Sequence, residues 1–233
     1  MSAPNQKTKR SRFWQRPFAS IIDKATGKYR AIYYQAKESL GHPKREIIVY
    51  QVEQARDSFE NAKTQFQNAL DQFSDVTHFQ GGSLESMYRI LKAEFKLSQD
   101  EANSVSERIK AIEKVADSLF DEWHNELSEY SNRSLRSQSR KQLKITQQQY
   151  RRLIKMMHNA EAKIQSVLAA FHDQVLFVKH NVNAKAISSL HSEFALVGIN
   201  IVTLISSMEK SINEANTFMN TLVDTPALTQ IEL

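Results

Sequence analysis

The chain contains no cysteine, and only five glycines and four prolines occur among its 233 residues. Without cysteine it can form no disulfide, thiol nucleophile, cysteine zinc site or lipid-modified cysteine. Glycine and proline are the residues that most often interrupt regular structure, so their scarcity permits long uninterrupted helices.

The sequence also lacks a long apolar run. Its amino terminus has no apolar core of the kind a signal peptide needs, and no stretch of about 18 consecutive apolar residues occurs. The richest run, residues 194–205, contains Gly198 and Asn200 and is typical of a buried helix. We therefore expect a cytoplasmic protein that does not cross a membrane and that is, at most, peripheral to the inner membrane.

What the sequence does have is a repeated apolar spacing of four and three residues, which is typical of long helices packed lengthwise. The first series is Ile48, Val52, Ala55, Phe59, Ala62, Phe66, Ala69, Phe73 and Val76. The second is Leu84, Tyr88, Leu91, Phe95, Ser98, Ala102, Val105, Ile109, Ile112, Ala116, Leu119 and Trp123. The third is Leu143, Thr146, Tyr150, Leu153, Met157, Ala160, Ile164, Val167 and Phe171.

These series predict helices over residues 44–76 and 84–130 and a third beginning near Leu135, after a polar hairpin at residues 131–134. Beyond Phe171 the spacing changes to fours, and it returns to heptads between Leu190 and Leu222. An inserted step of four residues unwinds a supercoil locally, whereas Asn181 or Asn183 could cap a new helix. Both interpretations stay open here.

We expect an all-α fold: an elongated antiparallel coiled coil or four-helix up-down bundle, with helices over residues 135–180 and 184–222. In that form, neighbouring helices must bury the apolar residues that flank the last series, namely Leu196, Ile199, Val202 and Ile205. The alternative is three long helices, the third continuous, with a second chain covering the same residues.

The chain divides by composition into a basic, largely disordered arm (residues 1–28), a helical bundle (29–224) and a flexible tail (225–233). A short helix is expected over residues 29–40, within the bundle domain. Residues 1–40 hold nine Lys or Arg against two acidic residues, a net charge of +7, although the whole chain carries only +5. The excess positive charge therefore belongs to the amino-terminal segment.

Basic and apolar side chains alternate in the arm. Basic residues interleaved with aromatic ones suit an anionic membrane surface, and they also suit phosphates and stacked bases. A solubilising tail, or a segment that docks on the bundle or on a partner, is the other interpretation. The candidate arm residues are Lys7, Lys9, Arg10, Arg12, Phe13, Trp14, Arg16, Phe18, Ile21 and Ile22.

A second basic block follows the predicted hairpin, with no acidic residue between Ser131 and Ala160. By itself it suggests nucleic acid, but folding about Asn132 would set Glu129 near Arg136 and Glu126 near Arg140. Pairing between neighbouring helices is the more ordinary explanation. The block comprises Arg133, Arg136, Arg140, Lys141, Lys144, Arg151, Arg152 and Lys155.

Catalytic and metal sites are not expected. A di-metal bundle uses two Glu-x-x-His units plus two further Glu, and the sequence offers only Asp121-Glu122-Trp123-His124 as a distant approach. No Gly-x-Ser-x-Gly turn is present to expose a nucleophile. We predict a non-enzymatic protein with no catalytic residue, cofactor or metal.

Several short blocks occur in order along the chain: Tyr33-Tyr34, residues 41–48 (GHPKREII), residues 52–57 (VEQARD), Gly81-Gly82, residues 119–123 (LFDEW) and residues 179–184 (KHNVNA). Together they resemble an uncharacterised helical family of gammaproteobacteria, a domain of unknown function. The resemblance covers residues 29–220 and implies an envelope setting, because members often carry a lipoprotein cysteine before the segment matching Tyr33-Tyr34. No activity or catalytic residue comes with it.

Here a basic aromatic arm takes the place of that cysteine. We therefore expect a scaffold or adaptor that binds another protein or itself, held to the cytoplasmic face of the inner membrane by the arm. The alternative is a nucleic-acid-associated coiled coil that uses the arm and the second basic block together.

Overall fold

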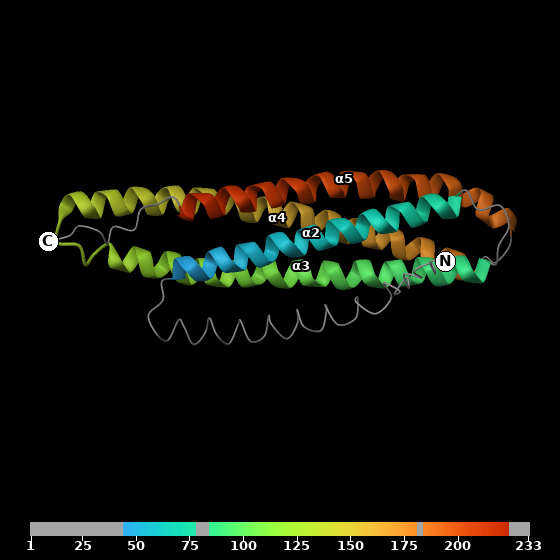
Figure 1. The fold of residues 1–233 in the computed structure, drawn as a ribbon, viewed down its shortest axis with the longest axis horizontal. Helices are drawn as coiled ribbons and strands as arrows, with labels where there is room; N and C mark the ends of the chain where they lie inside the picture. Colours follow the sequence, from blue (N-terminus) through green and yellow to red (C-terminus); the bar gives the residue numbers. More distant parts are fainter. Residues whose placement is uncertain (1–43, 78–83, 181–183, 224–233) are drawn as a thin grey trace, which may run out of the picture. The chain divides into compact units, whose positions relative to one another are not determined.

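The computed structural model describes residues 44–77, 84–180 and 184–223. They form four helices: α2 (Lys44–Thr77), α3 (Leu84–Glu126), α4 (Arg133–His180) and α5 (Ala184–Val223). These helices lie lengthwise beside one another (Figure 1), and no strand occurs in the described ranges. The all-α prediction is confirmed. The expected arm, the short helix at 29–40 and the tail lie outside the described residues.

Successive helices run in opposite directions. Phe95, early in α3, packs against Phe171, late in α4, with 5.6 Å between ring centroids. Trp123, late in α3, donates a hydrogen bond from Nε1 to Ser139 Oγ, early in α4, at 2.9 Å. The α4–α5 pair shows the same reversal through two contacts, Arg152 with Glu214 and Lys163 with Ser207. This is the up-down arrangement that the sequence predicts.

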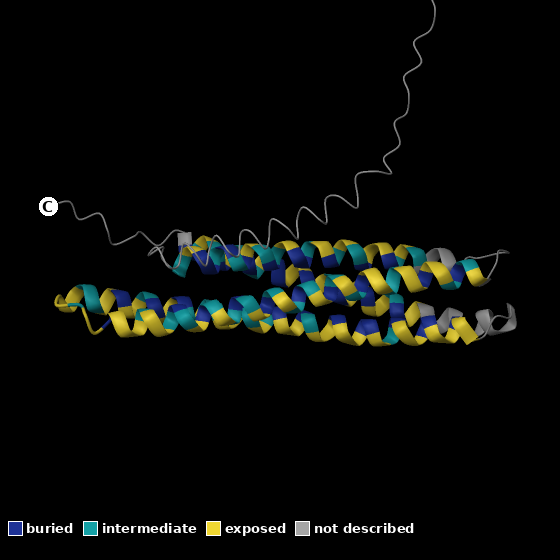
Figure 2. Ribbon diagram, turned by 90° about the horizontal axis from the view of Figure 1, so that it is seen from below, coloured by how far each residue is buried: buried dark blue, intermediate teal, exposed yellow. Residues whose placement is uncertain are grey.

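One apolar core runs through all four helices. The largest fully buried side chains include Phe59 and Phe66 of α2, Phe171 of α4 and Phe218 of α5. Each stands in a predicted apolar series, and the other described members of those series are buried or half-buried as well. The exposed residues form a separate face on each helix (Figure 2). Burial of these narrow apolar faces is the dominant force that holds the helices together.

Small buried residues lie on both α4 and α5. Ala160 of α4 and Ser211 and Ala215 of α5 are fully buried. The hydroxyl of Ser211 donates to the Met156 carbonyl across the interface, at 3.0 Å, and lies 3.2 Å from the Ser207 carbonyl of its own helix. A buried hydroxyl is thereby satisfied by backbone acceptors, which removes the desolvation cost that it would otherwise carry.

The hairpin between α3 and α4 forms where expected, but α3 ends at Glu126 rather than at residue 130. The amides of Ser128 and Glu129 bond carbonyls only three residues back, which tightens the chain and stops the α-helix. Asn132 then caps α4, since its Oδ1 accepts from the amides of Ser134 and Leu135 at 2.8 and 3.3 Å.

The break between the last two helices is also confirmed. α4 ends at His180 and α5 begins at Ala184, which are the bounds expected for the form with a break. α5 then returns antiparallel to α4, so the alternative of one continuous third helix is wrong.

The outer face of α5 corrects another expectation. Leu196, Ile199 and Val202 are 54%, 61% and 57% exposed, whereas only Ile205 packs partly against the core. The interruption between α4 and α5 therefore does not lead to burial of these three side chains. The physical reason is that the last apolar series of α5, which we call its seam, faces the core, so the opposite side of the helix faces solvent.

The span Ala195–Leu222 of α5 is long and apolar enough to cross a bilayer by length and composition. The span contains no run of about 18 consecutive apolar residues, as expected from the sequence, and it meets this broader criterion of mean hydropathy instead. Core helices of bundles meet it as well, and Ile201, Leu204 and Met208 of this span are fully buried against the other helices. The burial of the seam thus agrees with the interpretation of α5 as a core helix.

Leu119→Asp is expected to lower the free energy of unfolding by about 3–5 kcal/mol, because Leu119 is only 7% exposed and lies in the core. Urea unfolding followed by circular dichroism measures the change. Lys110→Ala, on an exposed position of the same helix, is the control and should change stability by less than about 0.5 kcal/mol. Equal losses in the two variants would contradict the assigned helix phase.

Candidate functional site

The ten candidate residues of the arm, from Lys7 to Ile22, lie outside the described residues. The second basic block lies within them, on the first half of α4. Seven of its eight residues are exposed, and Arg136 is half-buried.

Five of the block's residues make a straight row on the solvent side of α4. Their spacings of seven, four, seven and four residues return to the same face of a helix, opposite the buried Leu143, Thr146, Leu153 and Met157. At 1.5 Å per residue the row is about 33 Å long. We call it the α4 basic stripe, and it consists of Arg133, Arg140, Lys144, Arg151 and Lys155.

The expected charge pairing across the hairpin does not form. Arg136 donates to the backbone carbonyl of Tyr130 instead of meeting Glu129. No ion pair between described residues joins Arg140 to Glu126. The early end of α3 explains the difference, because the turn after Glu126 places a free carbonyl, rather than a carboxylate, beside Arg136. Arg152 does find a carboxylate, but on α5, where its Nε lies 3.0 Å from Glu214 Oε2.

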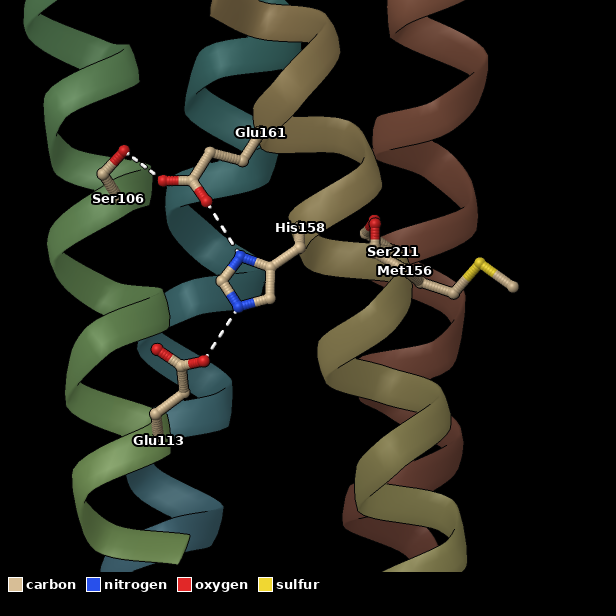
Figure 3. Close-up of polar contacts among 6 residues, drawn as sticks. All are labelled: Ser106, Glu113, Met156, His158, Glu161 and Ser211. Carbon is tan, nitrogen blue, oxygen red and sulfur yellow. Dashed lines mark hydrogen bonds and ion pairs between the residues drawn. The ribbon is translucent and has the colours of Figure 1, made fainter.

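Further along α4, His158 lies between two carboxylates (Figure 3). Its Nε2 is 2.8 Å from Glu113 Oε1 on α3, and its Nδ1 is 3.0 Å from Glu161 Oε2 on α4. Ser106 of α3 donates to the other oxygen of Glu161. The group therefore joins α3 to α4 through polar contacts at the edge of the core.

Protonation of His158 fits this geometry. An imidazolium can donate from both ring nitrogens, whereas a neutral ring donates from only one. The hydrogen bond with Glu113 is the largest cause and raises the pKa of His158. Burial is the next largest and lowers the pKa, but the Glu161 contact adds to the effect of Glu113, so the pKa lies above its ordinary value.

Tyr150 lies on the same side of α4 and packs against Phe120 of α3, with ring centroids 5.3 Å apart. Burial, followed by the nearby charges of Glu113 and Asp117, raises the pKa of Tyr150 to about 12. The phenol is therefore neutral at physiological pH and serves in packing, as the sequence suggests for this residue.

The histidine cluster is not arranged as a metal site. Its two carboxylates stand on opposite ring nitrogens, and one ion cannot contact both nitrogens of a single imidazole. Across the described residues, no group of three or more His, Asp or Glu side chains could hold a metal ion.

In the Asp121–His124 segment, Trp123 packs under Arg45, whose guanidinium carbon lies 5.2 Å from the ring centroid.

The contacts of His158 with Glu113 and Glu161 were not predicted from the sequence, where only the segment of His124 was considered, as a metal site. The spacing of three between His158 and Glu161 was a readable signal, because such residues are neighbours on a helix. The Glu113 contact, 45 residues away, depends on the register between α3 and α4.

A family model described as "Protein of unknown function (DUF2959)" matches residues 33–222, most of the chain. The chain belongs to this family. The match confirms the resemblance to a domain of unknown function, whereas the bacterial group and the lipid anchor of related chains stay predictions. No curated protein matches the sequence. Membership in DUF2959 brings no activity with it, so the function has to be argued from the chain itself.

His158→Gln should destabilise the protein at about pH 5.5 by less than about 1 kcal/mol, because the cluster is partly exposed. The pKa of His158 is higher in the folded state than in the unfolded state, where it is about 6.5. The charged imidazole therefore stabilises the fold fully below about pH 6.5, and this stabilisation is lost as the pH rises through the folded-state pKa. The difference from the unmodified protein should therefore vanish at about pH 9.

Urea unfolding at both pH values measures this effect, with His124→Gln as the control because His124 is exposed on α3. A His158→Gln penalty that stays constant between the two pH values would show that the imidazolium is not the stabilising form.

Proposed function

We propose that this DUF2959 protein is a non-catalytic helical scaffold that associates with an anionic membrane surface through its amino-terminal arm. The observation that carries the proposal is the distribution of charge. Residues 1–40 hold a net charge of +7, and the other 193 residues sum to −2. An electrostatic contact with an anionic surface therefore has its strongest source in the amino-terminal segment.

The composition of the arm favours a lipid surface. Phe13, Trp14 and Phe18 stand among the basic residues, and aromatic side chains partition into the interface between headgroups and acyl chains. Each Lys or Arg near an anionic leaflet contributes about 1 kcal/mol, and the apolar residues add a part that salt does not screen. The two contributions together suit reversible, peripheral attachment.

The bundle supports the non-catalytic half of the proposal. Its most polar inter-helix contacts, at His158, Ser211 and Trp123, join one helix to the next. Side chains used in this way fix the register of helices, which is what a scaffold requires. We propose that its partner is another protein or a second copy of the chain, on the cytoplasmic side of the inner membrane.

A nucleic-acid-associated coiled coil is the second candidate. The observation that favours it is the exposure of the second basic block on α4, since exposed Lys and Arg also neutralise phosphates. In that function the arm and the block act together on one polyanion.

Deletion of residues 1–28 should leave the helical content of the bundle intact and abolish binding to vesicles of phosphatidylglycerol and phosphatidylcholine. Binding of the full chain should weaken as salt rises, because the Debye length falls to about 10 Å at 0.1 M. Flotation at several salt concentrations, with circular dichroism as the folding check, measures both. Vesicles of phosphatidylcholine alone are the control.

Trp14→Ala combined with Phe18→Ala should impair vesicle binding more at high salt than at low salt. Salt screens the electrostatic contribution to binding, so the contribution of the apolar side chains becomes the larger share. Flotation of the truncated protein equal to that of the full chain would remove the arm from the proposal. Retention of duplex DNA, but not of anionic vesicles, by the full chain would favour the second candidate.

A further inference from the structure

We propose that the α4 basic stripe is a second contact with anionic phospholipid, which sets the orientation of the bundle on the bilayer. This inference rests on the proposed function, in which the arm brings the protein to the membrane. It adds a surface on the folded part of the chain, and the two contacts can fail independently.

The stripe has the geometry that a flat anionic surface requires. Arg133, Arg140, Lys144, Arg151 and Lys155 lie along one line of a single helix, on the side opposite its buried residues. α4 is the longest of the described helices and packs on two neighbours, α3 and α5, so the row is held rigidly. All five cationic groups can therefore approach one plane at once.

The charges of the stripe are available for such a contact. None of the five side chains forms an ion pair or hydrogen bond with another described residue, whereas Arg152 beside them is paired with Glu214. The exposed acidic residues Asp117 and Asp121 stand on α3. α3 as a whole carries ten acidic residues against six basic ones, which makes its side less favourable toward an anionic surface, so the outer face of α4 is the side that would turn to the lipid.

A bilayer fits the stripe better than nucleic acid does. The phosphates of a duplex wind around its axis, so a straight row on a convex bundle meets them only where a strand crosses it. The major groove admits a helix, but the flanks of α4 are occupied by α3 and α5. Single strands are held largely by stacking on aromatic side chains. Between residues 133 and 155 the only aromatic residue is Tyr150, which is half-buried against Phe120 and Phe218.

The first test removes three charges from the stripe in the full chain, by Arg140→Gln, Lys144→Gln and Arg151→Gln together. The matched control removes three charges from exposed positions of α3, by Lys96→Gln, Lys110→Gln and Lys114→Gln. Each basic residue near an anionic surface changes partitioning roughly fivefold, so the stripe variant should bind vesicles of phosphatidylglycerol and phosphatidylcholine about 100-fold more weakly at low salt. The control should change binding by less than about fivefold.

The second test reads orientation directly. Because the chain has no cysteine, a single introduced cysteine carries a unique fluorescent label. Ser137→Cys places the label beside the stripe, on an exposed position of α4, and Asn61→Cys places it on an exposed position of α2. Vesicles that carry a nitroxide on the lipid headgroup quench only at short range, so the label at residue 137 should be quenched on binding and the label at residue 61 should not.

The outcomes separate the stripe from the arm. Loss of binding in the stripe variant alone, with quenching at residue 137 alone, supports the inference. Equal quenching at both labels, equal binding of both charge variants, or no effect of the stripe variant overturns it and leaves the arm as the membrane contact. A full chain that binds no anionic vesicle overturns the proposed function as well. Stripe-dependent retention of duplex DNA in place of vesicles would assign the stripe to nucleic acid.

Discussion

Each described helix has to bury one narrow apolar face along nearly its whole length, and the rest of the structure depends on this requirement. A helix of 34 to 48 residues cannot satisfy it against a small partner, so the helices have to lie lengthwise. α4 meets the requirement with α3 on one side and α5 on the other. The placement of large and small residues then decides how closely each pair approaches. The Ser211 hydroxyl of α5 reaches the Met156 carbonyl of α4, whereas Phe59 and Phe66 of α2 are fully buried and fill the space between α2 and the other helices.

The same requirement explains which parts of the fold the sequence could predict. Apolar spacing is a property of one helix, so the apolar series and the hairpin were readable, and the break before Ala184 was one of two interpretations that the spacing allowed. The end of α3 was not, because the amides of Ser128 and Glu129 switch to shorter bonds without any glycine or proline to mark the position. The exposed Leu196 and Ile199 were misjudged for a different reason. Their burial depends on how many neighbours α5 has, and one sequence does not state that number.

Side-chain partners between helices were the least predictable feature. The pairing of Arg136 with Glu129 looked reasonable by distance along the hairpin, yet a backbone carbonyl took the place of the carboxylate. The His158 cluster needed the α3–α4 register to within one turn before Glu113 could be recognised as a partner. The position of the basic block on the solvent face, in contrast, follows from its phase relative to Leu143 and Leu153. Phase within a helix is therefore readable from sequence, and register between helices is not.

The contrast between His158 and the α4 basic stripe bears on function. The imidazole of His158 lies between the carboxylates of Glu113 and Glu161. At this position the bundle therefore pairs a positive charge with acidic partners, which stabilises the fold. In the stripe, the intervals Arg140–Lys144 and Arg151–Lys155 place like charges four residues apart, an arrangement that destabilises a helix by a few tenths of a kcal/mol per pair. Folding alone gives no reason to maintain such a row without acidic partners on the same helix. A reason arises if the row meets anionic headgroups, because the repulsion within the helix is then outweighed by attraction to the surface.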